Sequence, residues 1–182
     1  MDILNGPSED LNEAGDVYAV SSGRGVAHME KTASDGENSM IQTIFKIPDE
    51  NISLEPEISK AKFDSLPVIK LDGGIFRIGV GKVGNHESPV KLKAMPRIVL
   101  GRIIIKPLKK VEVPLDEELS QGLLYVLEGE GLVHGKDSSR IANGEHDVFF
   151  LFLACAKCAK LLHSLFFCGV LRPLLRQKYS YT

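Results

Sequence analysis

The sequence predicts an all-β protein, and three observations support this prediction. Short apolar runs recur along the chain with turn residues between them, residues 68–80 carry an Asp-Gly-Gly turn, and no stretch before residue 150 shows a convincing helical period. Short strands joined by turns are typical of sandwiches and barrels. With 182 residues, of which 43% are hydrophobic and 25% charged, the chain can bury the core of one domain or of two small ones.

The N-terminal part is expected to be β wherever it is ordered. Gly23 and Gly25 flank Arg24, and glycine there allows a positive φ or a close backbone approach just before a strand. The expected elements are, in order, a loose polar lead-in (1–13), a strand (16–20), the glycine loop (21–25), a polar loop (31–39) and an alternating strand closed by a proline (40–47).

The remaining strands follow a connector. Residues 49–67 mix acids, prolines and scattered apolar residues, which predicts a linker of short irregular pieces at a domain boundary. Residues 68–80 then read as two strands around the Asp-Gly-Gly turn, a strong hairpin signal. Further strands are predicted at 98–105, 122–127, 132–133 and 147–149.

His28 and Glu30 are the candidate metal ligands. They are two residues apart, so on an extended strand both side chains leave the same face. An imidazole and a carboxylate are ligands that mid-row divalent ions accept, but such ions take three or four N/O ligands. Taken alone, the pair therefore leaves two interpretations open: half of a metal site, or a solvated strand face.

The sequence around this pair resembles the pirin family of the cupin superfamily. The matching residues are GDV at 15–17, SGRGV at 22–26, HME at 28–30, MIQ at 40–42 and IP at 47–48. The resemblance implies a bicupin of two double-stranded β-helix barrels, with His28 and Glu30 as the second half of an Fe2+ site. The first half, a His-x-His on an earlier strand, has no counterpart here. The first barrel and its ligand set are therefore expected to be incomplete, as in a chain truncated at both ends.

The second half of the chain carries the same resemblance. Residues 123–131 and 144–148 are similar to the hairpin and return strand of a second pirin barrel. The positions that would hold a His-x-His carry Leu115 and Glu117, so this barrel is expected to be metal-free. The domains expected on this basis are the C-terminal part of a first cupin domain (1–48), a linker (49–67), a metal-free second cupin domain (68–149) and an atypical apolar tail (150–182).

The other histidines and the cysteines offer weaker sites. His86 lies in a polar turn, His134 near a strand end, and His146 between two acids, where a raised proton affinity is expected. All three cysteines lie in the tail, where residues 155–158 form a lone CxxC with Cys168 and His163 nearby. A zinc site needs a second ligand pair with matching spacing, and a disulfide needs an oxidising compartment. The sequence therefore favours inert, buried thiols.

The apolar stretch 148–171 is long enough to cross a bilayer. Its apolar residues contribute roughly −4 to −8 kcal/mol to insertion, while Lys157 and Lys160 cost about 2.5 to 3.5 kcal/mol each, so the sum lies near zero. A C-terminal membrane anchor is therefore the alternative to a cytoplasmic or nuclear protein, which is the expectation because no secretory signal opens the chain.

Two functions follow from the resemblance. The formal net charge of −2 gives no reason to expect direct nucleic-acid binding. With its incomplete metal site, the chain is expected to be a binding or regulatory protein, or an activity-impaired family member, with a protein partner of the transcription-regulator kind. The alternative is an iron-dependent quercetin 2,3-dioxygenase-type oxidoreductase that opens a flavonol with dioxygen, which needs an open metal face.

Overall fold

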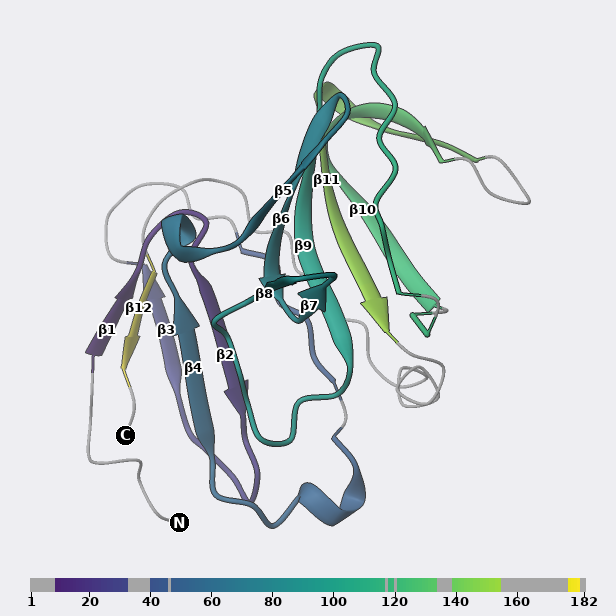
Figure 1. Ribbon diagram of the computed structural model, residues 1–182. Coiled ribbons are helices and arrows are strands. Elements are labelled where there is room, and N and C mark those ends of the chain that lie inside the picture. The colour runs from purple at the N-terminus through teal and green to yellow at the C-terminus, as the bar shows by residue number, and fades with distance from the viewer. Residues whose placement is uncertain are drawn as a thin grey trace. The chain divides into compact units, whose positions relative to one another are not determined.

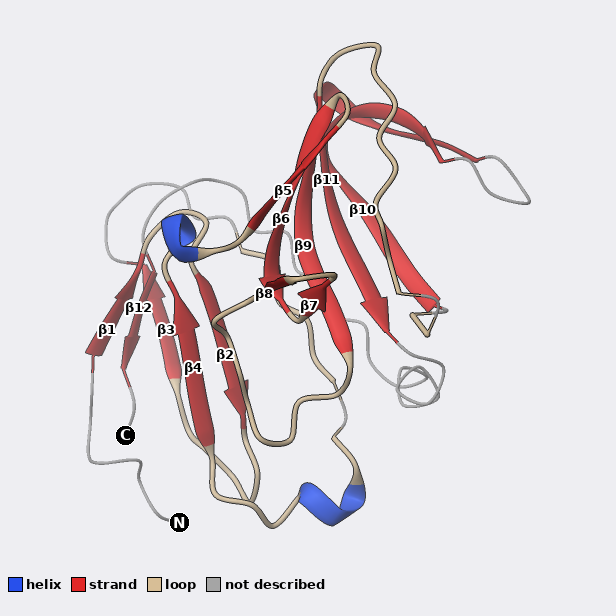
Figure 2. Ribbon diagram, in the orientation of Figure 1, coloured by secondary structure: helices blue, strands red, loops and turns tan. Residues whose placement is uncertain are grey.

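The computed structural model describes residues 9–32, 40–45, 47–116, 118–119, 121–133, 139–154 and 177–180. These residues form strands and two short 3-10 helices and contain no α-helix, which confirms the all-β prediction (Figures 1 and 2). The described strands lie in four separate sheets and do not close into a barrel. The chain divides into two compact units: unit 1 comprises residues 1–65, 89–96 and 159–182, and unit 2 comprises residues 66–88 and 97–158.

Unit 1 is built from two small antiparallel sheets. Its elements are β1 (Glu9–Asn12), β2 (Val17–Ser21), β3 (Met29–Thr32), η1 (Asp49–Asn51), β4 (Glu57–Ala61), η2 (Phe63–Ser65) and β12 (Gln177–Ser180). β12 lies between β1 and β3, with Glu9 opposite Ser180. β2 pairs with β4, with Val17 opposite Ala61.

Three predictions for this region were wrong in detail. β1 lies inside the lead-in 1–13, and β4 lies inside the connector 49–67. Residues 40–45 form no strand although their apolar residues alternate, and the Ile44 side chain is exposed. A strand requires a partner for its backbone N–H and C=O groups, and local alternation does not supply one. The strand predicted at 16–20 is confirmed as β2.

Unit 2 is one five-stranded antiparallel sheet with a small hairpin. Its elements are β5 (Val68–Leu71), β6 (Gly74–Val80), β7 (Lys82–Val83), β8 (His86–Glu87), β9 (Ile98–Ile105), β10 (Gln121–Val133) and β11 (Ser139–Ala154). The strand order is β10-β11-β9-β6-β5, so β10 and β5 form the two edges. The predicted hairpin at 68–80 is confirmed: β5 and β6 pair, and Gly73 in their turn has φ +95°.

The core of unit 2 lies on one face of this sheet. Its hydrophobic cluster consists of Phe76, Ile78, Val83, Val99, Ile103 and Val126. The strap, which we define as residues 106–116 and 118–119 between β9 and β10, packs Val111, Val113, Leu115 and Leu119 against them. Gly101 leaves room for the Phe76 ring, because a Cβ at Gly101 would lie 2.4 Å from Phe76 Cε2.

The long ribbon of β10 and β11 is interrupted by an irregularity in register. Glu128 lies opposite Val148, but the next residue of β10, Gly129, lies opposite Asn143. Residues 144–147 of β11 are therefore not paired with any residue of β10. The strands predicted at 122–127, 132–133 and 147–149 all fall within this ribbon.

The predicted tail is described only in part. Residues 148–154 belong to β11, whereas residues 155–176, with all three cysteines and His163, lie outside the described residues. In the part of the chain that the structure describes, no helix has the length and apolarity needed to cross a bilayer. The division of the chain into the four segments named above stays a prediction.

Candidate functional site

The glycine loop before β3 is held by backbone contacts to the turn after η1. Gly23 and Gly25 have φ +46° and +131°, as the sequence predicted. The Arg24 N–H donates to the Leu54 carbonyl at 2.9 Å, and the Arg24 guanidinium forms an ion pair with Glu55 at 2.7 Å. Both of these side chains are well exposed, so the backbone contact and not the ion pair fixes the loop.

Alanine substitution separates the roles of the two glycines. A Cβ at Gly23 would lie 2.0 Å from the Leu54 carbonyl oxygen, whereas a Cβ at Gly25 would meet nothing within 4 Å. We expect Gly23→Ala to lower the free energy of unfolding by more than about 2 kcal/mol, and Gly25→Ala by about 1 kcal/mol from its φ alone. Urea denaturation of both variants measures the difference, and equal losses would contradict a close contact at Leu54.

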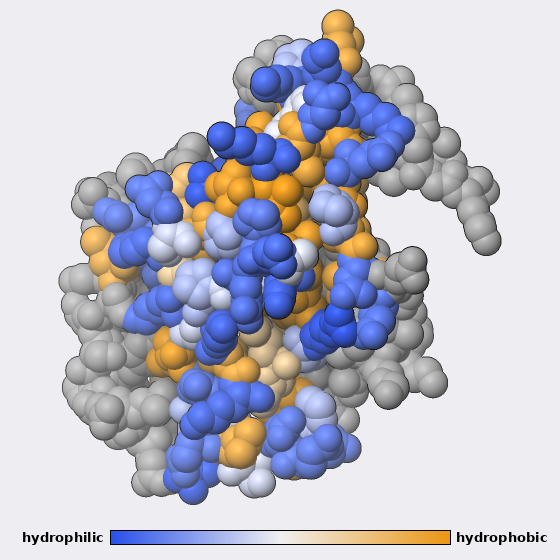
Figure 3. All heavy atoms as spheres, viewed as in Figure 1, coloured by the Kyte–Doolittle hydropathy of each residue, from blue (hydrophilic) through white to orange (hydrophobic). Residues whose placement is uncertain are grey.

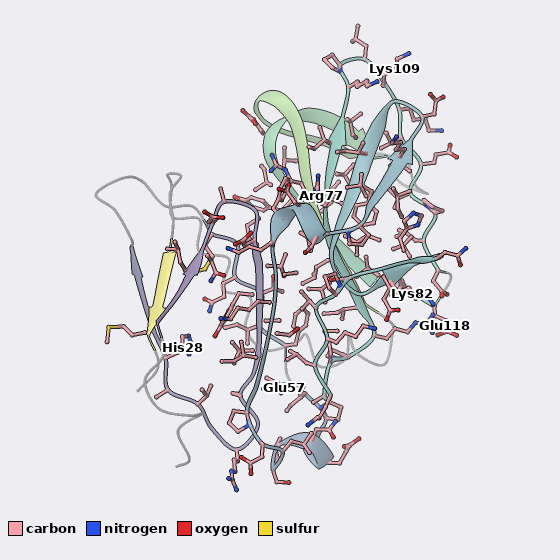
Figure 4. The ribbon with its side chains drawn as sticks, turned by 60° about the vertical axis from the view of Figure 1, so that its left-hand side comes forward. His28, Glu57, Arg77, Lys82, Lys109 and Glu118 are labelled. Atoms are coloured by element: carbon pink, nitrogen blue, oxygen red, sulfur yellow. The ribbon has the colours of Figure 1, made fainter. Side chains whose placement is uncertain are left out.

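His28 lies at the end of this loop, immediately before β3 (Figure 4). Its side chain is exposed. Glu30 lies within β3, opposite Tyr179 of β12, and its side chain is outside the described residues. β3 begins at Met29, so His28 immediately precedes the strand that contains Glu30.

The metal assignment of His28 and Glu30 stays a prediction, and the described residues do not fit an iron site. Among the side chains that the structure describes, no three His, Cys, Asp or Glu residues lie together as a group able to hold a metal ion. The side chain of Glu30, the other expected ligand, is outside the described residues. Iron takes more ligands than these two residues supply. No catalytic step through iron follows from this arrangement.

Asp16 is a well-connected carboxylate of unit 1, which the sequence marked only as part of the GDV motif. Its side chain is 4% exposed. One oxygen accepts from the Glu13 N–H at 2.9 Å and from Lys62 Nζ at 2.8 Å, and the other accepts from the Phe63 N–H at 2.9 Å. Asp16 thus ties the turn before β2 to η2, which follows β4.

These contacts set the protonation of Asp16. Burial disfavours the charged form, but the hydrogen bonds from Lys62, Glu13 and Phe63 together outweigh it and hold the pKa of Asp16 below its ordinary value of 3.8. The Lys62 ammonium has its pKa raised by the same hydrogen bond. Asp16 is therefore a structural anion, and its contacts leave it unsuited to accept a proton near neutral pH.

A lysine lies beside this cluster. Lys60 Nζ lies 5.7 Å from the centre of the Tyr18 ring, within the range of a cation–π contact. Partial burial, and then the charge of Lys62, lower the pKa of Lys60 from 10.5. Lys60 and Tyr18 come from opposed positions of β4 and β2, so the contact also supports their pairing.

The other histidines considered in the sequence analysis are far from His28 along the chain. His86 is exposed in the two-residue strand β8, opposite Val83. The backbone of His146 lies in the unpaired part of β11, and His134 lies outside the described residues. The buried polar side chain described in unit 2 is that of Ser88, whose hydroxyl donates to the Gly79 carbonyl at 2.6 Å.

This chain is similar in sequence to a known protein. A pirin-like protein of Solanum lycopersicum is 27% identical over 125 residues, which make up 69% of this chain and 42% of the relative. This chain therefore spans less than half the length of that protein. No family model matches the chain. No solved structure matches it either. The match supports a distant resemblance to the pirin family, whose cupin-type fold is all-β.

Proposed function

We propose that this chain is a pirin-like, cupin-type β protein whose metal site is incomplete and that works by binding another protein. The partner class that the resemblance suggests is a transcription regulator. The observation that supports this proposal is that no three His, Cys, Asp or Glu side chains of the described residues form a group able to hold a metal ion, while His28 is exposed at the end of a loop. Such a histidine is suited to a surface contact.

The packing of unit 2 supports the same role. Its sheet packs Phe76, Ile78 and their apolar neighbours against the strap, which gives the unit a hydrophobic core. β10 forms one edge of that sheet over 13 residues. Edge strands expose backbone donors and acceptors, which a strand of a partner can extend.

Metal content tests the proposal. We expect the purified full-length chain to hold well under one iron per chain by elemental analysis, and to consume no dioxygen when quercetin is added. The double variant His28→Ala, Glu30→Ala is expected to give the same values. His86→Ala serves as the matched control, because His86 is also exposed but belongs to unit 2.

The opposite result would establish the alternative function. One iron per chain that disappears in the double variant but not in His86→Ala, together with quercetin-dependent oxygen uptake, would overturn the proposal in favour of an iron-dependent dioxygenase. Partner binding is tested separately with a panel of purified transcription regulators in a pull-down assay. Binding that survives the double variant is expected, since the proposed contact does not require a bound metal.

A further inference from the structure

The turn at the start of the strap has an unusual residue at its corner. The Lys109 N–H donates to the Lys106 carbonyl at 3.1 Å, which closes a four-residue turn with Pro107 and Leu108 in the middle. The Lys106 N–H donates to the Gly73 carbonyl at 2.8 Å and fixes the turn to the β5–β6 hairpin. Leu108 has φ +58°. A turn with proline second and a positive φ third usually places glycine or asparagine at that third position.

Leu108 is disfavoured there for a second reason. Its side chain is 104% exposed, so it contacts no other described part of the chain. Among the described residues it is also the only non-glycine residue with positive φ. Folding gains nothing from an isobutyl group that faces water and strains its own backbone, and backbone strain of this kind is found at functional sites. The residue therefore points to a role outside the fold.

Cationic side chains surround this leucine. Lys106, Lys109 and Lys110 are all exposed, and we call residues 106–110 the leucine tip. Lys110 pairs with Glu112 at 2.7 Å, whereas Lys106 and Lys109 form no ion pair within the described part of the chain. Figure 4 labels Lys109 at the end of unit 2, and Figure 3 shows a hydrophobic projection beyond hydrophilic spheres at that end. Asp72, in the turn that receives the Lys106 N–H, is also exposed.

We propose that the leucine tip binds the surface of an anionic lipid bilayer, with Leu108 inserted among the headgroups and the lysines against their negative charges. A convex apolar tip with cations behind it suits a bilayer, because lipids close around an inserted group. A protein partner would need a preformed pocket. Lysines near an anionic leaflet attract it, and salt weakens that attraction. With Asp72 and Glu112 nearby, the binding is expected to be reversible and salt-sensitive.

Co-sedimentation with vesicles tests the proposal. We expect the full chain to sediment with vesicles of phosphatidylcholine and phosphatidylserine and to remain in solution with pure phosphatidylcholine. Leu108→Gly should weaken binding on the order of tenfold, from the lost burial of one leucine. Because glycine suits φ +58°, the same variant should be at least as stable to heat as the parent, so lost binding is not lost folding. The double variant Lys106→Glu, Lys109→Glu should bind still more weakly.

Fluorescence gives an independent measurement. The chain has no tryptophan, so Leu108→Trp places a single indole at the tip. Its emission is expected to shift to the blue when anionic vesicles are added. Ile52→Trp is the matched control, since Ile52 is 54% exposed but belongs to unit 1, and its emission should not change.

Three results would overturn the proposal: no sedimentation with anionic vesicles, sedimentation that Leu108→Gly leaves unchanged, or a blue shift at Ile52→Trp equal to that at Leu108→Trp. Binding of a soluble polyglutamate peptide by the parent chain, with no binding to vesicles, would assign the leucine tip to an acidic protein partner instead. None of these readouts depends on iron or on the proposed protein partner.

Discussion

Phe76→Ala will lower the free energy of unfolding of unit 2 by about 3 to 5 kcal/mol, the loss typical of a buried aromatic side chain. Phe76 is 0% exposed and lies in β6 among the core residues of unit 2. The gap cannot be filled from Gly101, which lies beside the ring and has no side chain. The surrounding strands are tied into the sheet on both sides, which limits their collapse into the cavity.

Urea denaturation followed by circular dichroism measures this loss. Ile104→Ala is the matched control, because Ile104 is an apolar residue of the adjacent strand β9 but is 36% exposed, and its substitution should cost less than about 1 kcal/mol. If both variants lost the same stability, the assignment of the core face of this sheet would be wrong.

The second large effect is expected at Asp16. Asp16→Ala removes the acceptor of the Glu13 and Phe63 N–H groups and of Lys62 Nζ. A hydrogen bond to a charged group contributes about 1.5 to 3 kcal/mol to stability. The bond from Lys62 contributes less, because its ammonium group is exposed to water. We therefore expect a total loss of about 2 to 4 kcal/mol for unit 1, measured by the same denaturation experiment.

Asp16 also makes stability depend on pH. Its pKa is lower in the folded chain than the ordinary 3.8, so the unfolded chain binds the proton more tightly. The stabilisation is complete above the unfolded pKa, and it is lost as the pH falls through the folded pKa. The parent chain should therefore lose stability on acidification below about pH 4, and this part of the loss should be missing in Asp16→Asn. An unchanged acid profile in Asp16→Asn would show that other groups control it.

Prediction from the sequence succeeded for strands whose pairing partners are close along the chain. The β5–β6 hairpin follows from its Asp-Gly-Gly turn and is present as expected. β1 was missed because its partner is β12, which is far away along the chain, and the sequence EDLN at 9–12 carries no local signal of that pairing. The strand predicted at 40–47 failed in the opposite way, since its apolar residues alternate but residues 40–45 form no strand. Local pattern indicates which residues suit a strand, and only the tertiary fold decides which of them find one.

The same limit applies to the sites. His28 immediately precedes β3 and Glu30 lies within it, and their assignment as metal ligands stays a prediction because the Glu30 side chain is outside the described residues. The role of Asp16 depends on Phe63, 47 residues away, which no motif indicates. Pro107 marks a turn in the sequence, but the positive φ of Leu108 is visible only in the folded backbone.

The break in register between β10 and β11 bears on how these strands tolerate changes of length. Residues 121–128 pair with 148–154, which are fixed by β9, whereas residues 129–133 pair only with 139–143. Residues 144–147 separate these two paired regions. The alternation of side chains between the two faces of the sheet therefore does not have to continue from one region into the other. Insertions or deletions in the outer part of the ribbon should therefore leave the inner strands in frame. In this outer part of the ribbon, residues 129–133 and 139–143, loop grafting or divergence between relatives should therefore cost little stability.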